Sequence, residues 1–196
     1  VLSGADWAPV LDCVRYHHAA ALRGAAKALP ADSPAYLVYL ANLLSGAADR
    51  RETEGESDAY RRELPLDAVF THLNGSHPGW AMPAQPQDGS LKLPQKSQPL
   101  SAAVYAEAVR TLEAQLPQLQ PQPEQLGKLL GLLETQLGCF PSSIYPGDGA
   151  DISLFDHSKT TAAIAACLSE YVQANHITDL RKTLFEQKND FCRKGV

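Results

Sequence analysis

Apolar residues recur at three- and four-residue steps along most of this chain, and stretches rich in proline separate the segments that carry them. This spacing places side chains on one face of a helix, because an α-helix has about 3.6 residues per turn. In residues 5–29 the steps connect Trp7, Val10, Leu11, Val14, His18 and Leu22, and Pro30 ends the segment. We therefore predict a mainly α fold whose first helix carries His18 on or near its inner face.

The same pattern predicts further helices. In residues 33–49 Pro34 suits the first turn, and the apolar side holds Tyr36, Leu37, Leu40, Leu43 and Leu44. Helices are also predicted over 101–116, 123–137 and 179–190, with a Gln/Pro tract between the first two.

The strongest helix signal follows Ser153, which together with Asp156 fits a capping box. Beyond it one helix face collects Leu154, His157, Thr161, Ile164, Ala165 and Leu168. We therefore expect His157 to point inward, one turn from the helix start.

The one strand signal lies in the Gly- and Pro-rich insertion 74–99. There Trp80–Ala84 and Ser90–Leu93 suit a small β-hairpin across Asp88–Gly89. Residues 50–63 are almost all polar or charged, which is typical of a surface loop.

Composition narrows the function classes. With 196 residues and 44% hydrophobic content the chain suffices for one sizeable core, and we favour one domain over 1–196. The net charge of −5 disfavours long-range attraction of a nucleic acid duplex, so any nucleic acid contact is expected to be local. The four cysteines form no Cys-x-x-Cys pair, so we interpret them as reduced packing thiols. No apolar run and no leader indicates a membrane or secretory protein, which favours the cytoplasm.

His17, His18 and His157 are the candidate site residues. Neutral imidazole is the commonest protein ligand for transition metals, so convergence of these rings would give a metal site and hydrolytic chemistry. The alternative is structural: one imidazole of the pair faces solvent, the other bonds within the core, and His157 caps or bridges helices. The remaining histidines, His72, His77 and His176, are interpreted as surface residues. A P-loop is excluded, because no glycine-rich loop precedes Lys159, and no Gly-x-Ser-x-Gly elbow occurs.

Three phrases of this sequence resemble a known family. They are VRYHH at 14–18, AYLVYLAN at 35–42 running into DRRE at 49–52, and DISLFDHSKTTAAIA at 151–165. Their order and spacing are similar to those of the large signature subunit of type III-A (Csm-type) CRISPR-Cas effector complexes, in its N-terminal HD-type domain. The third phrase is the most specific.

The resemblance implies a circularly permuted, HD-like helical bundle. The histidine that begins an ordinary HD fold would be His157, and the paired histidines would be His17 and His18. In the family this domain is a metal-dependent nuclease that cuts single-stranded DNA once the complex recognises foreign RNA, while a separate palm region makes cyclic oligoadenylate. The three histidines would be catalytic metal ligands for a divalent transition metal such as Mn²⁺ or Ni²⁺, and Lys159 a weak phosphate contact. The implied partners are other Csm subunits, guide RNA and single-stranded DNA.

This sequence differs from the family's pattern in two places. The family's opening phrase Leu-Leu-His-Asp-Ile-Gly-Lys is missing, so we expect an HD domain incomplete at its N-terminus, without the palm region. We therefore expect this chain alone to be inactive as a nuclease. The metal is expected in the complete domain, and whether this chain alone holds it or has an empty site is left open. The second departure is Asn42, which stands where the family usually carries an aspartate. An amide supplies no anionic oxygen, so metal affinity should fall. The alternative is a non-catalytic helical docking or regulatory module with a degenerate HD site; an HD phosphohydrolase acting on nucleotides is a third reading.

Overall fold

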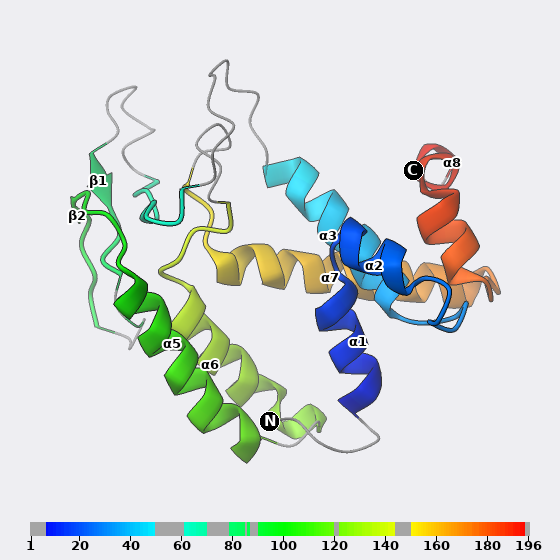
Figure 1. Cartoon of the computed structure of the whole chain (residues 1–196), viewed down its shortest axis with the longest axis horizontal. Helices are drawn as coiled ribbons and strands as arrows, with labels where there is room; N and C mark the ends of the chain where they lie inside the picture. Colours follow the sequence, from blue (N-terminus) through cyan, green and yellow to red (C-terminus); the bar gives the residue numbers. More distant parts are fainter. Residues whose placement is uncertain are drawn as a thin grey trace. The chain divides into compact units, whose positions relative to one another are not determined.

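The computed structural model describes residues 7–49, 61–69, 79–84, 86, 90–119, 122–143 and 150–194. These residues are mainly helical, with a single two-stranded antiparallel sheet among them, which confirms the predicted fold class (Figure 1). The chain divides into two compact units. The terminal unit comprises Ser3–Ala48 and Ser158–Val196, and the middle unit comprises Val1–Leu2 and Asp49–His157. A single domain over 1–196 stays a prediction.

The core of the terminal unit is built around helix α3, Ala35–Asp49. Tyr36 and Leu40 on this helix are completely buried and pack in one cluster with Leu22 and Leu184. The two buried α3 residues are four positions apart, as the helical period requires. Leu43 and Leu44 are 38% and 36% exposed, so the buried side of α3 is narrower than predicted.

The single helix predicted over 5–29 is wrong. The structure has two helices there, α1 (Ala8–Tyr16) and α2 (Ala19–Ala25), separated at His17–His18. His18 adopts extended backbone, with φ −101° and ψ 144°, so the chain turns before α2 begins. A turn of this kind changes the direction of the helix faces, and a spacing counted across it no longer predicts burial. As a result His18 is exposed rather than inward, and Val14 is 63% exposed.

The last predicted helix, 179–190, is also two elements. A π-helical turn, η4 (Arg181–Glu186), is followed by α8 (Lys188–Lys194). Arg181 joins this segment to the end of α2, because its Nη1 donates a hydrogen bond to the Ala26 carbonyl (2.9 Å) and its backbone N–H donates to Ala31 (2.9 Å). A guanidinium at a helix C-terminus satisfies a carbonyl that has no partner within the helix.

The predicted hairpin exists, but its second strand lies later in the sequence. Strand β1 (Trp80–Ala81) pairs antiparallel with β2 (Gln95–Lys96), with Trp80 opposite Lys96 and Ala81 opposite Gln95 (Figure 1). Ser90–Leu93 is not a strand. The connection between the strands thus runs from Met82 to Pro94 instead of being a two-residue turn, and Asp88 and Gly89 lie outside the described residues.

Two helices pack side by side in the middle unit, α5 (Ala102–Gln115) and α6 (Leu126–Leu137), with the 3₁₀ turns η2 (Leu116–Gln118) and η3 (Pro123–Gln125) between them (Figure 1). Both helices confirm the prediction. Their core cluster contains Leu100, Ala108, Cys139 and Phe140, and the Tyr105 ring stacks on Phe140 with centroids 4.7 Å apart.

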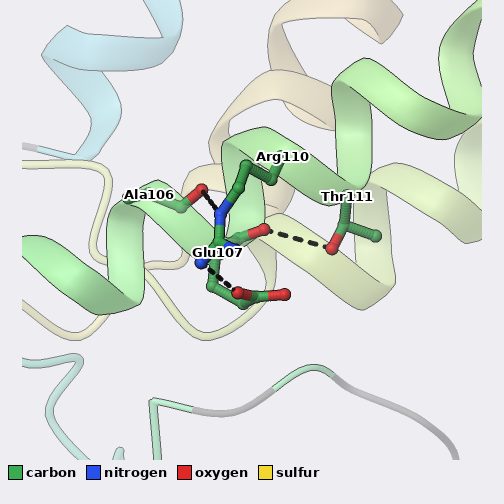
Figure 2. A network of polar contacts seen from close by, with 4 residues as sticks. All are labelled: Ala106, Glu107, Arg110 and Thr111. Carbon is green, nitrogen blue, oxygen red and sulfur yellow. Dashed lines mark hydrogen bonds and ion pairs between the residues drawn. The ribbon is translucent and has the colours of Figure 1, made fainter.

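The outer side of α5 is polar. Figure 2 shows Arg110 paired with the Glu107 carboxylate, while Arg110 Nε donates to the Ala106 carbonyl (3.4 Å) and the Thr111 hydroxyl donates to the Glu107 carbonyl (3.1 Å). Both partners of the ion pair are mostly exposed, so it contributes little to stability.

Some of the predicted surface residues lie outside the described ranges. The polar loop at 50–63 falls largely on residues that are not described, as do His72 and His77. His176 is exposed, as predicted.

His176 also offers a stability test, because it has a left-handed backbone with φ 52° and lies two residues beyond the end of helix α7 (Leu154–Ala174). Its N–H donates to Gln173 O (3.2 Å) and the next N–H, of Ile177, donates to Val172 O (3.0 Å), the pattern of a Schellman cap. Only glycine adopts this conformation without steric cost. We expect His176→Gly to raise the free energy of unfolding by about 0.5–1 kcal/mol in urea denaturation.

The matched control is Ala174→Gly, on the last residue of α7, which should lower that free energy by up to about 1 kcal/mol. A lower stability for His176→Gly than for the unchanged chain would contradict this assignment.

Candidate functional site

The paired histidines form the turn between α1 and α2. Their ring centroids lie 3.9 Å apart and the rings are tilted by 44°. His17 is half-buried and His18 is exposed. The His17 Nδ1 lies 2.6 Å from the Val14 carbonyl oxygen. Because a carbonyl only accepts, Nδ1 is the donor of this bond, and in the neutral ring Nε2 then carries the lone pair.

Local sequence explains why His17 stands this way. Helix α1 ends at Tyr16, and Val14 belongs to the last turn, whose carbonyls have no partner within the helix. The His17 side chain supplies a donor for one of them, a role suited to histidine at a helix C-terminus. The extended His18 then starts α2, since its carbonyl accepts from the Leu22 N–H at 2.9 Å.

Asn42 fixes the same turn from the side of α3. Its Nδ2 donates to the backbone carbonyl of His17 at 3.5 Å, a contact between residues 25 positions apart in sequence. A carboxylate at this position has no hydrogen to donate. Asn42 therefore has a structural function that sequence reasoning missed. From the sequence, Asn42 stood out only because the family usually carries an aspartate ligand at this position. No local sequence pattern predicts a bond to a carbonyl outside its own helix.

His157 lies in the first turn of α7, and the predicted cap by Ser153 is confirmed, while the Asp156 carboxylate bonds to the Ser153 hydroxyl and not to the Ser153 N–H of a full capping box. The Ser153 hydroxyl oxygen accepts from the Asp156 N–H (3.0 Å), and the same hydroxyl donates to the Asp156 carboxylate (2.7 Å). The His157 N–H in turn donates to the Ser153 carbonyl (3.0 Å). The His157 side chain is half-buried, while Lys159 is exposed.

The structure brings together only part of the predicted site. His17, His18 and Asn42 belong to the terminal unit, and the first two contact each other while Asn42 bonds to His17. Lys159 belongs to the same unit, and His157 is the last residue of the middle unit. The convergence of His157 with the histidine pair stays a prediction.

The donor set fits a divalent transition metal in part. His17 offers one ring nitrogen whose lone pair is set by the bond on the opposite nitrogen, the arrangement usual for metal-ligating histidines. Asn42 offers a neutral amide and no anionic oxygen. Within the described ranges no group of three or more His, Cys, Asp or Glu side chains is arranged to hold a metal ion.

The middle unit contains an apolar cavity of about 270 Å³ next to α5. Its lining includes Val104, Ala108, Cys139 and Phe140, and Glu107 reaches it from α5. The Cys139 thiol is buried and lies 3.9 Å from the Gln136 carbonyl, to which it donates; burial raises its pKa, so it stays a protonated thiol at neutral pH. All four cysteines are free, in agreement with the prediction of reduced thiols, but Cys167 is exposed and is therefore not a packing thiol.

In the described part of the chain, no helix combines the length and the apolar character needed to cross a bilayer.

Comparisons with known proteins identify relatives for nearly the whole chain. It is 32% identical over 192 residues to the CRISPR system single-strand-specific deoxyribonuclease Cas10/Csm1 (subtype III-A) of Mycobacterium tuberculosis (strain ATCC 25618 / H37Rv), a match covering 93% of this chain and 23% of the relative. The Enterococcus italicus protein of the same description is 30% identical over 200 residues, or 95% of this chain and 26% of the relative. The Streptococcus thermophilus protein is 29% identical over 217 residues, or 97% and 27%.

These matches confirm the resemblance to the large subunit of type III-A CRISPR systems. The chain spans about a quarter of the length of the curated relatives it matches. No protein-family model matches the chain.

The Ser153 cap holds the first turn of α7, which carries His157, and its contribution to stability can be measured. Ser153→Ala removes the acceptor of the Asp156 N–H, so we expect the free energy of unfolding to fall by about 1 kcal/mol. Thermal and urea unfolding followed by circular dichroism measure this change. The control is Thr160→Ala, an exposed position on the same helix, which should stay within about 0.5 kcal/mol of the unchanged chain. Equal effects of the two substitutions would show that Ser153 is not the cap of α7.

Proposed function

We propose that this chain is the histidine-bearing, HD-type part of a metal-dependent deoxyribonuclease specific for single-stranded DNA, acting in type III-A CRISPR antiviral defence. In this proposal His17, His18 and His157 are the metal ligands. The relatives named above, which match 93–97% of the chain, carry the name single-strand-specific deoxyribonuclease. The observation that carries the proposal is the hydrogen bond from His17 Nδ1 to the Val14 carbonyl, which supports a ligand role for Nε2.

The chemistry is phosphodiester hydrolysis. When bound, a divalent ion such as Mn²⁺ or Ni²⁺ supplies a water of lowered pKa and positive charge for the transition state. The chain's own contribution is orientation: the Val14 carbonyl holds the His17 ring, and the Ser153 cap holds the first turn of α7 with His157. Lys159, exposed two residues further along α7, is a weaker candidate for a phosphate contact.

The proposal has three further parts: membership of a Csm complex with guide RNA, a cytoplasmic location, and a circularly permuted HD-like order of helices. Their support is the resemblance of the three sequence phrases to the type III-A large subunit. The relatives add that the chain is similar to a protein of a subtype III-A CRISPR system.

One observation favours a second function, a non-catalytic docking or regulatory module with a degenerate site. The Asn42 amide donates one hydrogen bond to the His17 backbone carbonyl, a contact between α3 and the turn that aspartate cannot make. An amide retained for structure at a ligand position is what a decayed metal site would show.

Metal binding tests the proposal on this chain itself. We expect His17→Ala and His18→Ala each to weaken Mn²⁺ or Ni²⁺ binding at least about tenfold in calorimetric titration, because each removes a nitrogen ligand. The matched control is His176→Ala, an exposed histidine outside the site, which should leave the affinity unchanged. Metal affinity that is equal in all of these variants would refute the ligand assignment.

Asn42 separates the two functions, because its two roles respond to substitution in opposite directions. Asn42→Asp adds an anionic oxygen and should raise metal affinity, yet it loses the bond to His17 and should lower the free energy of metal-free unfolding by about 0.5–1.5 kcal/mol. Asn42→Ala should lower stability by a similar amount without any gain in affinity.

Cleavage of single-stranded DNA decides which function holds. Strong metal-dependent cutting by the full-length protein only after Asn42→Asp would identify a degenerate site, whereas equal cutting with either residue supports the nuclease. We expect the 196-residue chain alone to give no appreciable cleavage, and robust cleavage by it would overturn that expectation.

A further inference from the structure

The hairpin of the middle unit exposes a large aromatic side chain. Trp80 on β1 is 54% exposed, while its neighbour Ala81 is 2% exposed and points into the unit. Tryptophan is usually well buried, so an exposed indole on a regular element is an unusual feature. Figure 1 shows the strand that carries it paired with β2 at one edge of this unit.

The backbone holds Trp80 rigidly from both sides. On one side the Ala68 N–H donates to the Trp80 carbonyl (3.1 Å) and the Met82 N–H donates to the Leu66 carbonyl (2.7 Å). On the other side the Ser97 N–H donates to the Gly79 carbonyl (2.7 Å), next to the Trp80–Lys96 pair. A ring presented by a strand bonded on both edges loses little freedom when a ligand binds to it.

The residue opposite Trp80 is a lysine. Lys96 is exposed and directly faces Trp80 across the strand pair, a position in which side chains on one face are in contact range. From Trp80 to Ala106 the charged residues are Asp88, Lys92 and Lys96, so this segment carries a net charge of +1 while the whole chain carries −5. The two paired strands themselves bear one charge, that of Lys96, beside the indole of Trp80.

We propose that Trp80 and Lys96 form a platform for single-stranded nucleic acid, in which an unpaired base stacks on the indole and Lys96 contacts the adjacent phosphate. The inference deepens the proposed function, on which it rests for the substrate class. A ring that accepts the face of one base suits an unpaired strand, whereas the bases of a duplex are already stacked on each other. The neighbouring ammonium favours a phosphate-bearing ligand over an apolar protein surface.

The experiment measures binding of a fluorescein-labelled oligothymidylate by anisotropy, with EDTA present so that no cleavage occurs. We expect Trp80→Ala to weaken binding from about fivefold to more than a hundredfold, and Trp80→Phe to retain most of it, because phenylalanine still stacks. Lys96→Gln should weaken binding and reduce the slope of log affinity against log salt by about one. The same oligonucleotide in duplex form should bind much more weakly.

Leu93→Ala is the matched control, since Leu93 is a 66% exposed apolar residue in the same insertion. It should leave binding unchanged. A loss equal to that of Trp80→Ala would indicate an apolar docking surface for protein and overturn the proposal, as would unchanged binding by Trp80→Ala.

Tryptophan emission gives a readout that needs no disruptive variant. The chain has two tryptophans, so Trp7→Phe leaves Trp80 as the single emitter. A stacked base should quench its emission on addition of oligothymidylate, and no change at saturation would contradict stacking.

Binding and cleavage measurements separate a failure of the proposed platform from a failure of the proposed nuclease function. His176→Ala should bind the oligonucleotide as well as the unchanged chain, because this exposed histidine belongs neither to the platform nor to the proposed metal site. Binding that depends on Trp80 in a protein that never cuts DNA would refute the nuclease alone. Cutting that is independent of Trp80 would refute the platform alone.

Discussion

The hydrogen bond from His17 Nδ1 to the Val14 carbonyl is the contact on which the account of the site depends. It does two things at once. It satisfies a carbonyl at the end of α1, where the helix has no donor of its own, and it fixes which ring nitrogen of His17 keeps a lone pair. One interaction therefore ends α1, begins the turn to α2 and orients the ring that we propose as a metal ligand.

Asn42 shows how structure and chemistry compete at this turn. The amide of Asn42 bonds to the backbone of His17, whose ring is a candidate ligand, so replacing Asn42 with a carboxylate also removes a bond between α3 and the turn. A carboxylate would serve the metal and lose the carbonyl, while the amide serves the carbonyl and gives the metal only a neutral oxygen. The same side chain thus links the stability of the terminal unit to its chemistry.

Local signals in the sequence predicted those elements whose cause is local. The cap at Ser153 and the helices at 101–116 and 123–137 appear where their periodicity and flanking prolines place them. The break at His17–His18 was missed, because it is stabilised by a side-chain bond and by a contact from α3, neither of which has a sequence pattern. The second hairpin strand was misplaced for a similar reason. The turn residues Asp88–Gly89 favour a short connection, whereas the register follows from burial of Ala81 and from pairing of β1 with residues 66–68 on its other edge.

The most direct test of the account is long-range ¹H–¹⁵N NMR of the histidine rings during titration with Zn²⁺. It reports the tautomer of each imidazole and the nitrogen that a metal contacts. The account predicts that His17 is protonated at Nδ1 before metal is added and that its Nε2 resonance then shifts. Protonation at Nε2, or a titration that leaves the His17 ring unchanged while other histidines respond, would contradict it.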